Sequence, residues 1–167
     1  QKYFNVSSKA DMLDEFFLFS KSPAFNKCLS DCEKVSKSNS NILLVGESGT
    51  GKDVAGKSIH VCSSRFDKNM IAVNCSSYTE SLLESELFGY NEGAFTGATK
   101  SKEGKIELSD KGTLFLDEIG DSSPATQLKL LRAIETRQIE RIGSNTPRRL
   151  DFRLICATNR DLKEDIL

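Results

Sequence analysis

The chain has 167 residues and a formal net charge of -1, and hydrophobic residues make up 38% of it. This length suffices for one domain with its own core, and the near-neutral charge gives no global signal for nucleic acid or an anionic membrane. No apolar run approaches the roughly 20 residues that cross a bilayer. The five cysteines are odd in number and include no C-x-x-C pair, which argues against a disulfide framework or zinc site. We therefore predict a cytoplasmic protein with no membrane partner.

The first helix of the domain is predicted to start at Ser22-Pro23, with serine as the N-cap and proline in the first turn. Residues 1–21 are interpreted as a linker leading into the domain, with a short helix in 11–19. Residues 22–167 are assigned to the domain itself. After Pro23, apolar side chains recur at helical spacing as Phe25, Cys28, Leu29, Cys32 and Val35. We expect Cys28 and Cys32 to be buried as apolar residues.

Further along the chain, short apolar runs alternate with helical patterns. Strands are predicted at 41–45, 70–73, 112–116 and 152–157, and the first of them is expected to be buried on both faces. Helices are predicted from the end of a glycine-rich turn to about residue 63, over 79–88, and from Ser123-Pro124 with Leu128, Leu131 and Ile134 at helical spacing. Residues 142–150 are predicted as a loop. This alternation predicts an α/β fold, a three-layer sandwich with a mostly parallel sheet.

A phosphate-binding loop is predicted after the first strand. Its residues are Gly46, Glu47, Ser48, Gly49, Thr50, Gly51 and Lys52, which fit G-x-x-x-x-G-K. In such a loop, backbone N–H groups and a helix N-terminus bind phosphate, and the lysine reaches the β- and γ-phosphates. A chance glycine-rich turn is the alternative, and the flanking strand and helix argue against it. Asp53 stands where a magnesium-binding Ser or Thr usually follows, and an aspartate can bind the metal directly or through water.

Two acids and two asparagines follow predicted strands. Asp117 and Glu118 end the third strand, at the edge of an open α/β sheet where ligands bind. We predict that Asp117 holds Mg²⁺ and that Glu118 orients and activates the attacking water in ATP hydrolysis. Asn159 follows the fourth strand and is a candidate for contacting the γ-phosphate or water, while Asn74 follows the second and is a candidate for hydrogen bonding to Glu118. The alternatives are a solvated acidic turn and two turn-forming asparagines.

A hexapeptide between these motifs has an unusual composition. It consists of Gly93, Ala94, Phe95, Thr96, Gly97 and Ala98, in which small residues surround one phenyl ring and one hydroxyl. Because an exposed aromatic ring gains nothing from water, this pattern predicts a loop that binds a partner. His60 is too far along the helix after the phosphate loop to face phosphate, so we expect it to be packed or at the surface.

Taken together, these motifs resemble the central AAA+ ATPase domain of sigma-54-dependent transcriptional activators. The resemblance runs from about residue 22 to the end and rests on Gly46–Asp53, Leu82–Phe88, Gly93–Ala98, Gly112–Asp121 and Ala157–Leu162. It implies a hexameric ring that hydrolyses ATP with Mg²⁺ and remodels the closed complex of sigma-54 RNA polymerase. It also implies that Phe95 and Thr96 touch sigma-54, that Asn74 is a switch residue, and that Asn159 is the sensor I residue.

The resemblance further implies parts that lie outside this chain. Arginine fingers and a helical lid are expected beyond Leu167, and DNA contact is expected through a separate domain. We therefore expect this fragment alone to show little ATPase activity and no stable hexamer.

Two residues depart from the family pattern. Asp53 stands where the family more often has Glu, and Lys111 stands where it more often has Gly. The remaining alternatives are an AAA+ ATPase with another client and a nucleotide-binding module without turnover.

Overall fold

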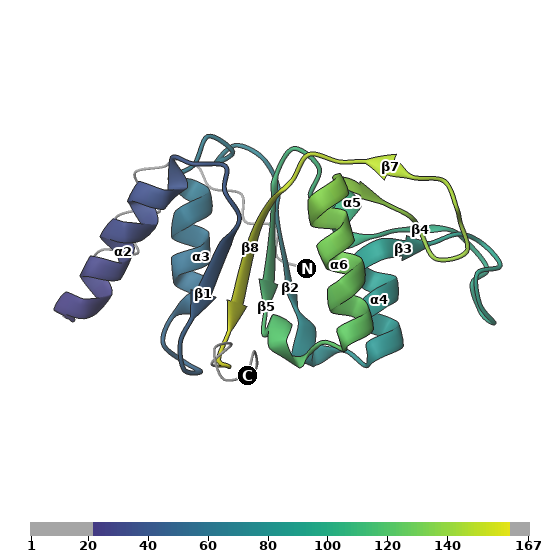
Figure 1. Ribbon diagram of the computed structural model, residues 1–167, viewed down its shortest axis with the longest axis horizontal. Coiled ribbons are helices and arrows are strands. Elements are labelled where there is room, and N and C mark those ends of the chain that lie inside the picture. Colours follow the sequence, from purple (N-terminus) through teal and green to yellow (C-terminus); the bar gives the residue numbers. More distant parts are fainter. Residues whose placement is uncertain (1–21, 161–167) are drawn as a thin grey trace.

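The structure is a computed structural model that describes residues 22–160 (Figure 1). A helix predicted within residues 11–19 and the last part of the Ala157–Leu162 motif lie outside the described residues. Within residues 22–160, no helix is long and apolar enough to cross a membrane.

Four parallel strands form the central sheet, in the order β1-β8-β5-β2. The strands are β1 (Ile42–Val45), β8 (Arg153–Thr158), β5 (Thr113–Asp117) and β2 (Met70–Asn74). Helices α2 (Pro23–Ser36) and α3 (Lys52–Val61) lie on one side of the sheet, and α4 (Glu80–Phe88) and α6 (Pro124–Thr136) lie on the other (Figure 1). The predicted three-layer α/β sandwich with a parallel sheet is confirmed. Because the strands are parallel, their carboxyl ends meet at one edge of the sheet.

Side chains of β5 alternate between two hydrophobic cores. Leu114 and Leu116 point into the core that includes residues of α4 and α6, and both are fully buried. Phe115 points into the other core, where it packs with Ile59 of α3 and Ile155 of β8. A strand whose two faces are both covered in this way reads as a continuous apolar run, as the sequence of β5 does.

Strand β1 differs from the prediction that both of its faces are buried. Ile42 and Leu44 pack against the core of the α3 side, but Leu43 and Val45 are 47% and 59% exposed. β1 lies at the end of the strand order, and the described residues leave one of its faces largely open. A short apolar run does not distinguish a central strand from an edge strand.

Helix α2 begins as predicted, because the Ser22 side chain accepts a hydrogen bond from the Phe25 backbone N–H at 3.4 Å. The prediction that both cysteines of this helix are buried is confirmed for one of them and wrong for the other. Cys32 is buried next to Leu29, whereas Cys28 is exposed, and Val35 is 42% exposed. Only a narrow stripe of α2 is covered, because the helix lies on the outside of the molecule and packs chiefly on α3.

Helix α6 also begins as predicted, with the Ser123 side chain accepting from the Thr126 N–H at 3.2 Å. Of the three residues placed at helical spacing from the sequence, only Ile134 packs against the core. Leu128 and Leu131 are 51% and 48% exposed, while the buried residues are Thr126, Leu130 and Ala133. Both sets have helical spacing, so periodicity alone does not select between them; packing of the helix on the sheet does.

Two small antiparallel pairs extend from the sandwich beyond α4 (Figure 1). In one, β3 (Gly89–Tyr90) pairs with β4 (Lys102–Glu103), and helix α5 (Lys105–Leu108) follows. In the other, β6 (Gln138–Ile139) pairs with β7 (Arg148–Arg149). The prediction of a plain loop over 142–150 is therefore wrong at β7. Two-residue strands carry too little pattern for sequence periodicity to reveal them. Residues 22–160 also contain two 3₁₀ turns, η1 (Cys75–Ser77) and η2 (Ile119–Asp121).

Helix α3 is fixed on β5 by one close approach and one buried hydrogen bond. A Cβ added to Gly56 would lie 2.4 Å from Cε2 of Phe115, so the ring packs directly on the helix backbone. His60 Nδ1 lies 2.9 Å from Oγ1 of Thr113, at the start of β5. Burial lowers the pKa of His60 to about 4. The sequence predicted that His60 is either packed or at the surface, and it is packed. Its contact with Thr113 ties helix α3 to β5, the strand that ends in Asp117.

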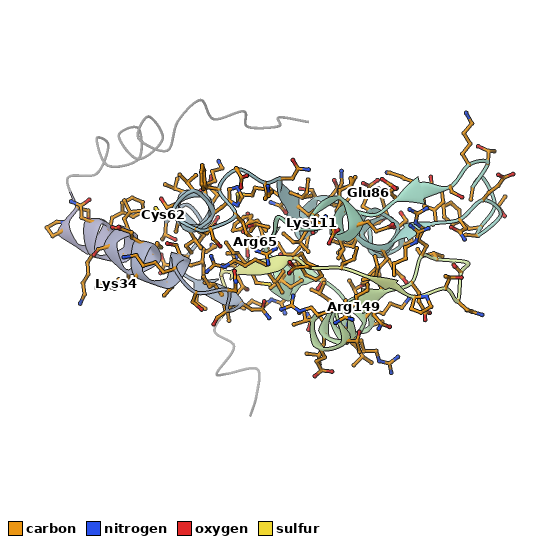
Figure 2. All side chains as sticks on the ribbon, turned by 90° about the horizontal axis from the view of Figure 1, so that it is seen from above. Lys34, Cys62, Arg65, Glu86, Lys111 and Arg149 are labelled. Atoms are coloured by element: carbon orange, nitrogen blue, oxygen red, sulfur yellow. The ribbon has the colours of Figure 1, made fainter. Side chains whose placement is uncertain are left out.

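Polar contacts hold the opposite edge of the sheet together (Figure 2). Arg65 donates to the Gly112 carbonyl at 3.3 Å and to Asp151 Oδ1 at 2.7 Å, and the Lys111 backbone N–H donates to the Asp151 carbonyl at 2.6 Å. Arg153 is 1% exposed and donates to two carbonyls at the end of α2. This positive side chain complements the negative end of the α2 dipole.

Candidate functional site

The predicted phosphate loop links β1 to α3 and lies at the carboxyl edge of the sheet. The Gly46 N–H donates to the Thr158 carbonyl at 3.2 Å, which joins the loop to the end of β8. Gly49 and Gly51 have φ angles of 79° and 89°, a region that side chains disfavour. Helix α3 begins directly after Gly51, so its N-terminal N–H groups face the loop.

Lys52 connects the phosphate loop with the predicted catalytic acid. Its Nζ donates to the carbonyl oxygens of Gly46 at 2.8 Å and Glu47 at 3.1 Å, and it lies 3.6 Å from Oε1 of Glu118. Thr50 Oγ1 also donates to the Glu47 carbonyl, at 2.7 Å. The side chains of Lys52 and Glu118 are only 10% and 14% exposed. Two motifs that are far apart in the sequence therefore meet within ion-pair distance.

Asp117 has the surroundings expected of a magnesium ligand. It ends β5, and its Oδ1 accepts a hydrogen bond from the Glu118 N–H at 3.1 Å. Burial and then the charge of Glu118 raise the pKa of Asp117, and the charge of Asp53 acts in the same direction. A carboxylate whose ionised form is disfavoured by neighbouring acids is stabilised when a cation binds there.

The described residues do not form a complete metal cage. Among residues 22–160, no group of three or more His, Cys, Asp or Glu side chains is arranged to hold a metal ion. Mg²⁺ is usually held by one or two carboxylates together with water and phosphate oxygens, so Asp117 fits this ion. The Asp53 side chain is 59% exposed and pairs with Lys57 at 3.6 Å, one turn further along α3. Asp53 is thus largely open to solvent, with Lys57 close by.

Glu118 and Asn159 are in contact, which the sequence did not predict. Glu118 has a φ angle of 51°, and its Oε2 accepts a hydrogen bond from the backbone N–H of Asn159 at 3.1 Å. This contact uses the backbone of Asn159, so its side-chain amide stays a candidate for contacting the γ-phosphate or water, as the sequence predicted.

Asn74 does not form the hydrogen bond to Glu118 that the sequence suggested. Its Oδ1 accepts from the backbone N–H of Ser76 at 3.0 Å and from the Ser76 hydroxyl at 2.7 Å, so it caps η1. Asn74 nevertheless lies beside the acids, because it is paired with Asp117 in the β2–β5 register. An asparagine at a strand end readily caps the following turn, and this local contact wins here.

The Gly93–Ala98 loop lies between β3 and β4, away from the phosphate loop (Figure 1). It consists of two consecutive turns: the Ala94 N–H donates to the Asn91 carbonyl at 3.1 Å, and the Ala98 N–H donates to the Phe95 carbonyl at 3.0 Å. Phe95 is 46% exposed, in line with the predicted loop. Its ring also contacts Tyr90, with centroids 4.9 Å apart and planes at 62°. Sequence reasoning missed Tyr90, which belongs to a two-residue strand.

The segment after β6 lies against the base of this loop (Figure 1). The Asn91 N–H donates to the Ile142 carbonyl, and the Ile142 N–H donates to the Gly89 carbonyl, both at 3.0 Å. A Cβ added to Gly143 would lie 2.7 Å from Cβ of Ala94. The two protruding segments are therefore in direct contact with each other.

A buried ion-pair cluster supports both segments. Arg141 donates from Nε to Glu107 Oε1 at 2.7 Å and from Nη2 to Oε2 at 2.8 Å, and Arg148 donates to Oε2 at 3.1 Å. The pKa of Glu107 lies below its usual value, because burial alone would raise it but the bonds and charges of the arginines outweigh burial. Arg148 thus has a partner within the domain, while Arg149 is exposed. Sequence reasoning missed Glu107 and Arg141, which pair across 34 positions.

Comparisons with known proteins agree with this arrangement. A family model described as "Sigma-54 interaction domain" matches residues 18–167. The chain is 49% identical over 152 residues to the transcriptional regulatory protein ZraR of Salmonella typhimurium, and 50% identical over 145 residues to the Nif-specific regulatory protein of Bradyrhizobium diazoefficiens. These matches cover 91% and 87% of this chain but only 34% and 25% of those proteins.

Solved structures show the same relationship. NtrX from Brucella abortus in complex with ATP has a TM-score of 0.79 and 34% identity, over 88% of this chain and 31% of that one. A second structure of NtrX from Brucella abortus gives a TM-score of 0.81 at 35% identity, over 89% of this chain and 32% of that one. The phosphate loop, the acids at the sheet edge and the Gly93–Ala98 loop agree with the family match across nearly the whole sequence. The chain belongs to the sigma-54 interaction domain family, the AAA+ domains of sigma-54-dependent transcriptional activators.

Proposed function

We propose that this domain hydrolyses ATP and uses the energy to remodel the closed complex of sigma-54 RNA polymerase, which activates transcription. The observation that carries the proposal is the pairing of Lys52 with Glu118 at 3.6 Å beside Asp117, in a domain that also carries the Gly93–Ala98 loop. Nucleotide chemistry and partner contact then have separate places in one small fold. The alternative is an AAA+ ATPase acting on another client.

The phosphate chain of ATP would bind along Gly46–Lys52. Backbone N–H groups of the loop and the N-terminus of α3 supply hydrogen bonds and a favourable dipole. Lys52 would move its hydrogen bonds from the loop carbonyls to the β- and γ-phosphates. The ATP complex of the related NtrX structure supports nucleotide binding by this fold. Asp117 would bind Mg²⁺, with Asp53 acting through water, and the ion would neutralise charge on the phosphates.

Glu118 would orient the water that attacks the γ-phosphate. Its two oxygens already have fixed partners, Lys52 on one side and the Asn159 N–H on the other, which restrict the carboxylate to one orientation. In phosphoryl transfer, positioning and charge stabilisation supply most of the catalysis. The side chain of Asn159 would act as the sensor that contacts phosphate or water, and Asn74 would act as a switch by exchanging Ser76 for Glu118 as its partner.

The position of Asn74 offers a path from the nucleotide to the partner loop. Asn74 caps η1, the chain then continues directly into α4 and β3, and β3 leads into Gly93–Ala98. A change in the hydrogen bonds of Asn74 would therefore be transmitted along a continuous stretch of chain. Phe95 and Thr96 would be the residues that touch sigma-54. Assembly of six copies into a ring and DNA binding through a separate domain are part of the same proposal.

A native gel with purified sigma-54 tests the proposal. The protein used is the chain extended through the lid and arginine fingers that the resemblance implies, with and without ADP–aluminium fluoride, which mimics the transferring phosphoryl group. A complex that forms only with the analogue supports a sigma-54 activator whose loop responds to the nucleotide. ATP hydrolysis without any complex would instead favour an AAA+ ATPase with another client.

A further inference from the structure

In the Gly93–Ala98 loop, the exposed ring of Phe95 is in contact on one side with Tyr90 of β3, the strand that leads into the loop. Phe95 packs edge-on against Tyr90, with ring centroids 4.9 Å apart and an interplanar angle of 62°. This is the T-shaped arrangement that aromatic pairs prefer. Phe95 is still 46% exposed, so part of the ring remains open to a partner while the rest is in contact with Tyr90.

Tyr90 is attached to the body of the domain from two sides. It pairs with Lys102 of β4 on one side and forms a bridge to Ile142 on the other. The neighbouring Asn91 N–H adds a hydrogen bond to the Ile142 carbonyl. Tyr90 is itself half-buried. The backbone at Tyr90 is therefore held on both sides, and the tyrosine ring that contacts Phe95 extends from this anchored position.

The rest of the loop offers Phe95 little other support. Gly93 and Gly97 have φ angles of 78° and 101°, and a Cβ added to either would find no atom within 4 Å. Thr96 is exposed, and Ala98 is the one residue of the six that is buried. The turn hydrogen bonds set the backbone, but among the described ring contacts only the one with Tyr90 fixes the direction of the phenyl ring.

We propose that Tyr90 is a positioning residue that holds Phe95 in the orientation in which it binds sigma-54. This inference rests on the proposed function. The hexapeptide carries no charged residue, so the matching surface of sigma-54 would be an apolar pocket that accepts an aromatic ring. An edge-to-face aromatic pair lowers free energy by an amount that corresponds to a roughly two- to tenfold population difference. Loss of Tyr90 should therefore weaken sigma-54 binding by this factor.

The first experiment tests the contact without sigma-54. Because the chain has no tryptophan, Phe95→Trp places a single fluorescent reporter in the loop. Adding Tyr90→Ala should make this tryptophan clearly more accessible to acrylamide quenching, whereas adding Tyr90→Phe, which keeps the ring, should leave quenching nearly unchanged. Equal quenching with all three residues at position 90 would overturn the proposed contact.

The second experiment measures sigma-54 binding in the extended protein used above, by titration in the presence of ADP–aluminium fluoride. Tyr90→Ala should weaken the complex about two- to tenfold while ATP hydrolysis stays unchanged, and Tyr90→Phe should bind like the unmodified protein. Phe66→Ala is a matched control, since Phe66 is an aromatic residue 52% exposed outside the loop. Thermal unfolding of each variant shows whether the fold is retained.

The outcomes separate this inference from the proposed function. If the unmodified protein forms no complex with sigma-54, the proposed function fails, and with it the role of Tyr90 in binding. If the unmodified protein binds and Tyr90→Ala binds equally well, the proposed function stands and the positioning role of Tyr90 is refuted.

Discussion

At the scale of single residues, Glu118 combines a strained backbone with a nearly buried charge. Its φ angle of 51° directs the carboxylate toward both Lys52 and the Asn159 N–H.

Glu118→Gln keeps the size of the side chain and an oxygen that accepts from Asn159, but it removes the negative charge. We expect nucleotide affinity to be retained and turnover in the extended protein to fall by roughly 10²- to 10⁴-fold. Binding of a fluorescent ATP analogue and a phosphate-release assay measure the two effects; unchanged turnover would exclude Glu118 as the residue that orients water.

Lys111 is strained without a compensating side-chain contact among the described residues. Its φ angle is 62°, in the left-handed region, and its side chain is exposed while its backbone N–H bonds to Asp151. Glycine adopts this conformation without steric strain. We expect Lys111→Gly to raise the free energy of unfolding by about 1 kcal/mol, measured by urea denaturation.

Arg137→Gly is the matched control for Lys111→Gly. Arg137 has a similar φ angle of 55°, but its side chain donates to the Phe152 carbonyl at 2.6 Å and its guanidinium lies 5.5 Å from the centre of the Phe152 ring. Its loss should offset the relief of strain, so this variant should be no more stable than the parent. Stabilisation by both substitutions, or by neither, would contradict the strain argument.

At the scale of secondary-structure elements, the contact between α3 and β5 joins the two halves of the nucleotide site. Gly56 allows the Phe115 ring to lie on the helix, where a methyl group would come within 2.4 Å. Gly56→Ala gains up to about 1 kcal/mol in helix propensity but overpacks the core at a cost of about 1–3 kcal/mol. We therefore expect a net loss of stability, seen as a lower urea midpoint, and weaker ATP binding.

Phe115→Leu in the same chain provides the control for Gly56→Ala. The smaller side chain removes the ring atoms that the new methyl group would meet. The effects of the two substitutions should then be less than additive, because one relieves the clash that the other creates. Full additivity would show that the helix and strand are not coupled through this contact.

At the scale of the whole molecule, the buried His60 makes stability depend on pH. Its pKa of about 4 in the folded state is below the usual 6.5, because burial disfavours the charged form. The folded state therefore binds fewer protons than the unfolded state between these values. His60 therefore makes its full contribution to the free energy of unfolding above about pH 6.5. This contribution, ~3 kcal/mol in total, is lost as the pH falls toward 4.

The variant His60→Asn lacks this titration and isolates the effect. The difference in unfolding free energy between the parent and His60→Asn, measured by urea denaturation from pH 7 to 4, should shrink or reverse as the pH falls. Carboxylates such as Glu107, whose pKa lies below its usual value, are present in both proteins and cancel in the difference. A difference that stays constant over this range would show that His60 does not titrate as its burial implies.

The overall plan of the molecule separates the predicted phosphate loop from the Gly93–Ala98 loop. The phosphate loop and the acids after β5 lie at the carboxyl edge of the sheet, while the Gly93–Ala98 loop and the segment after β6 protrude beyond α4 (Figure 1). The stretch from Asn74 through η1, α4 and β3 links the two regions along the chain. Glu107 and Arg141 fasten the protruding segments to α5. In the proposed function, this arrangement would convert a local change near phosphate into movement of the Gly93–Ala98 loop.

The sequence by itself determined the parts that depend on local chemistry. The Gly46–Lys52 loop, the acids after β5 and the alternation of strands and helices are encoded in short stretches whose residue types have few other uses. Only the tertiary structure decided that β1 has an open face, that Leu130 rather than Leu131 is buried, and that Asn74 caps η1. It alone brought Tyr90 to Phe95 and Arg141 to Glu107. The physical reason is that burial and side-chain pairing depend on which elements pack together, whereas a helical or strand pattern specifies only what each element can offer.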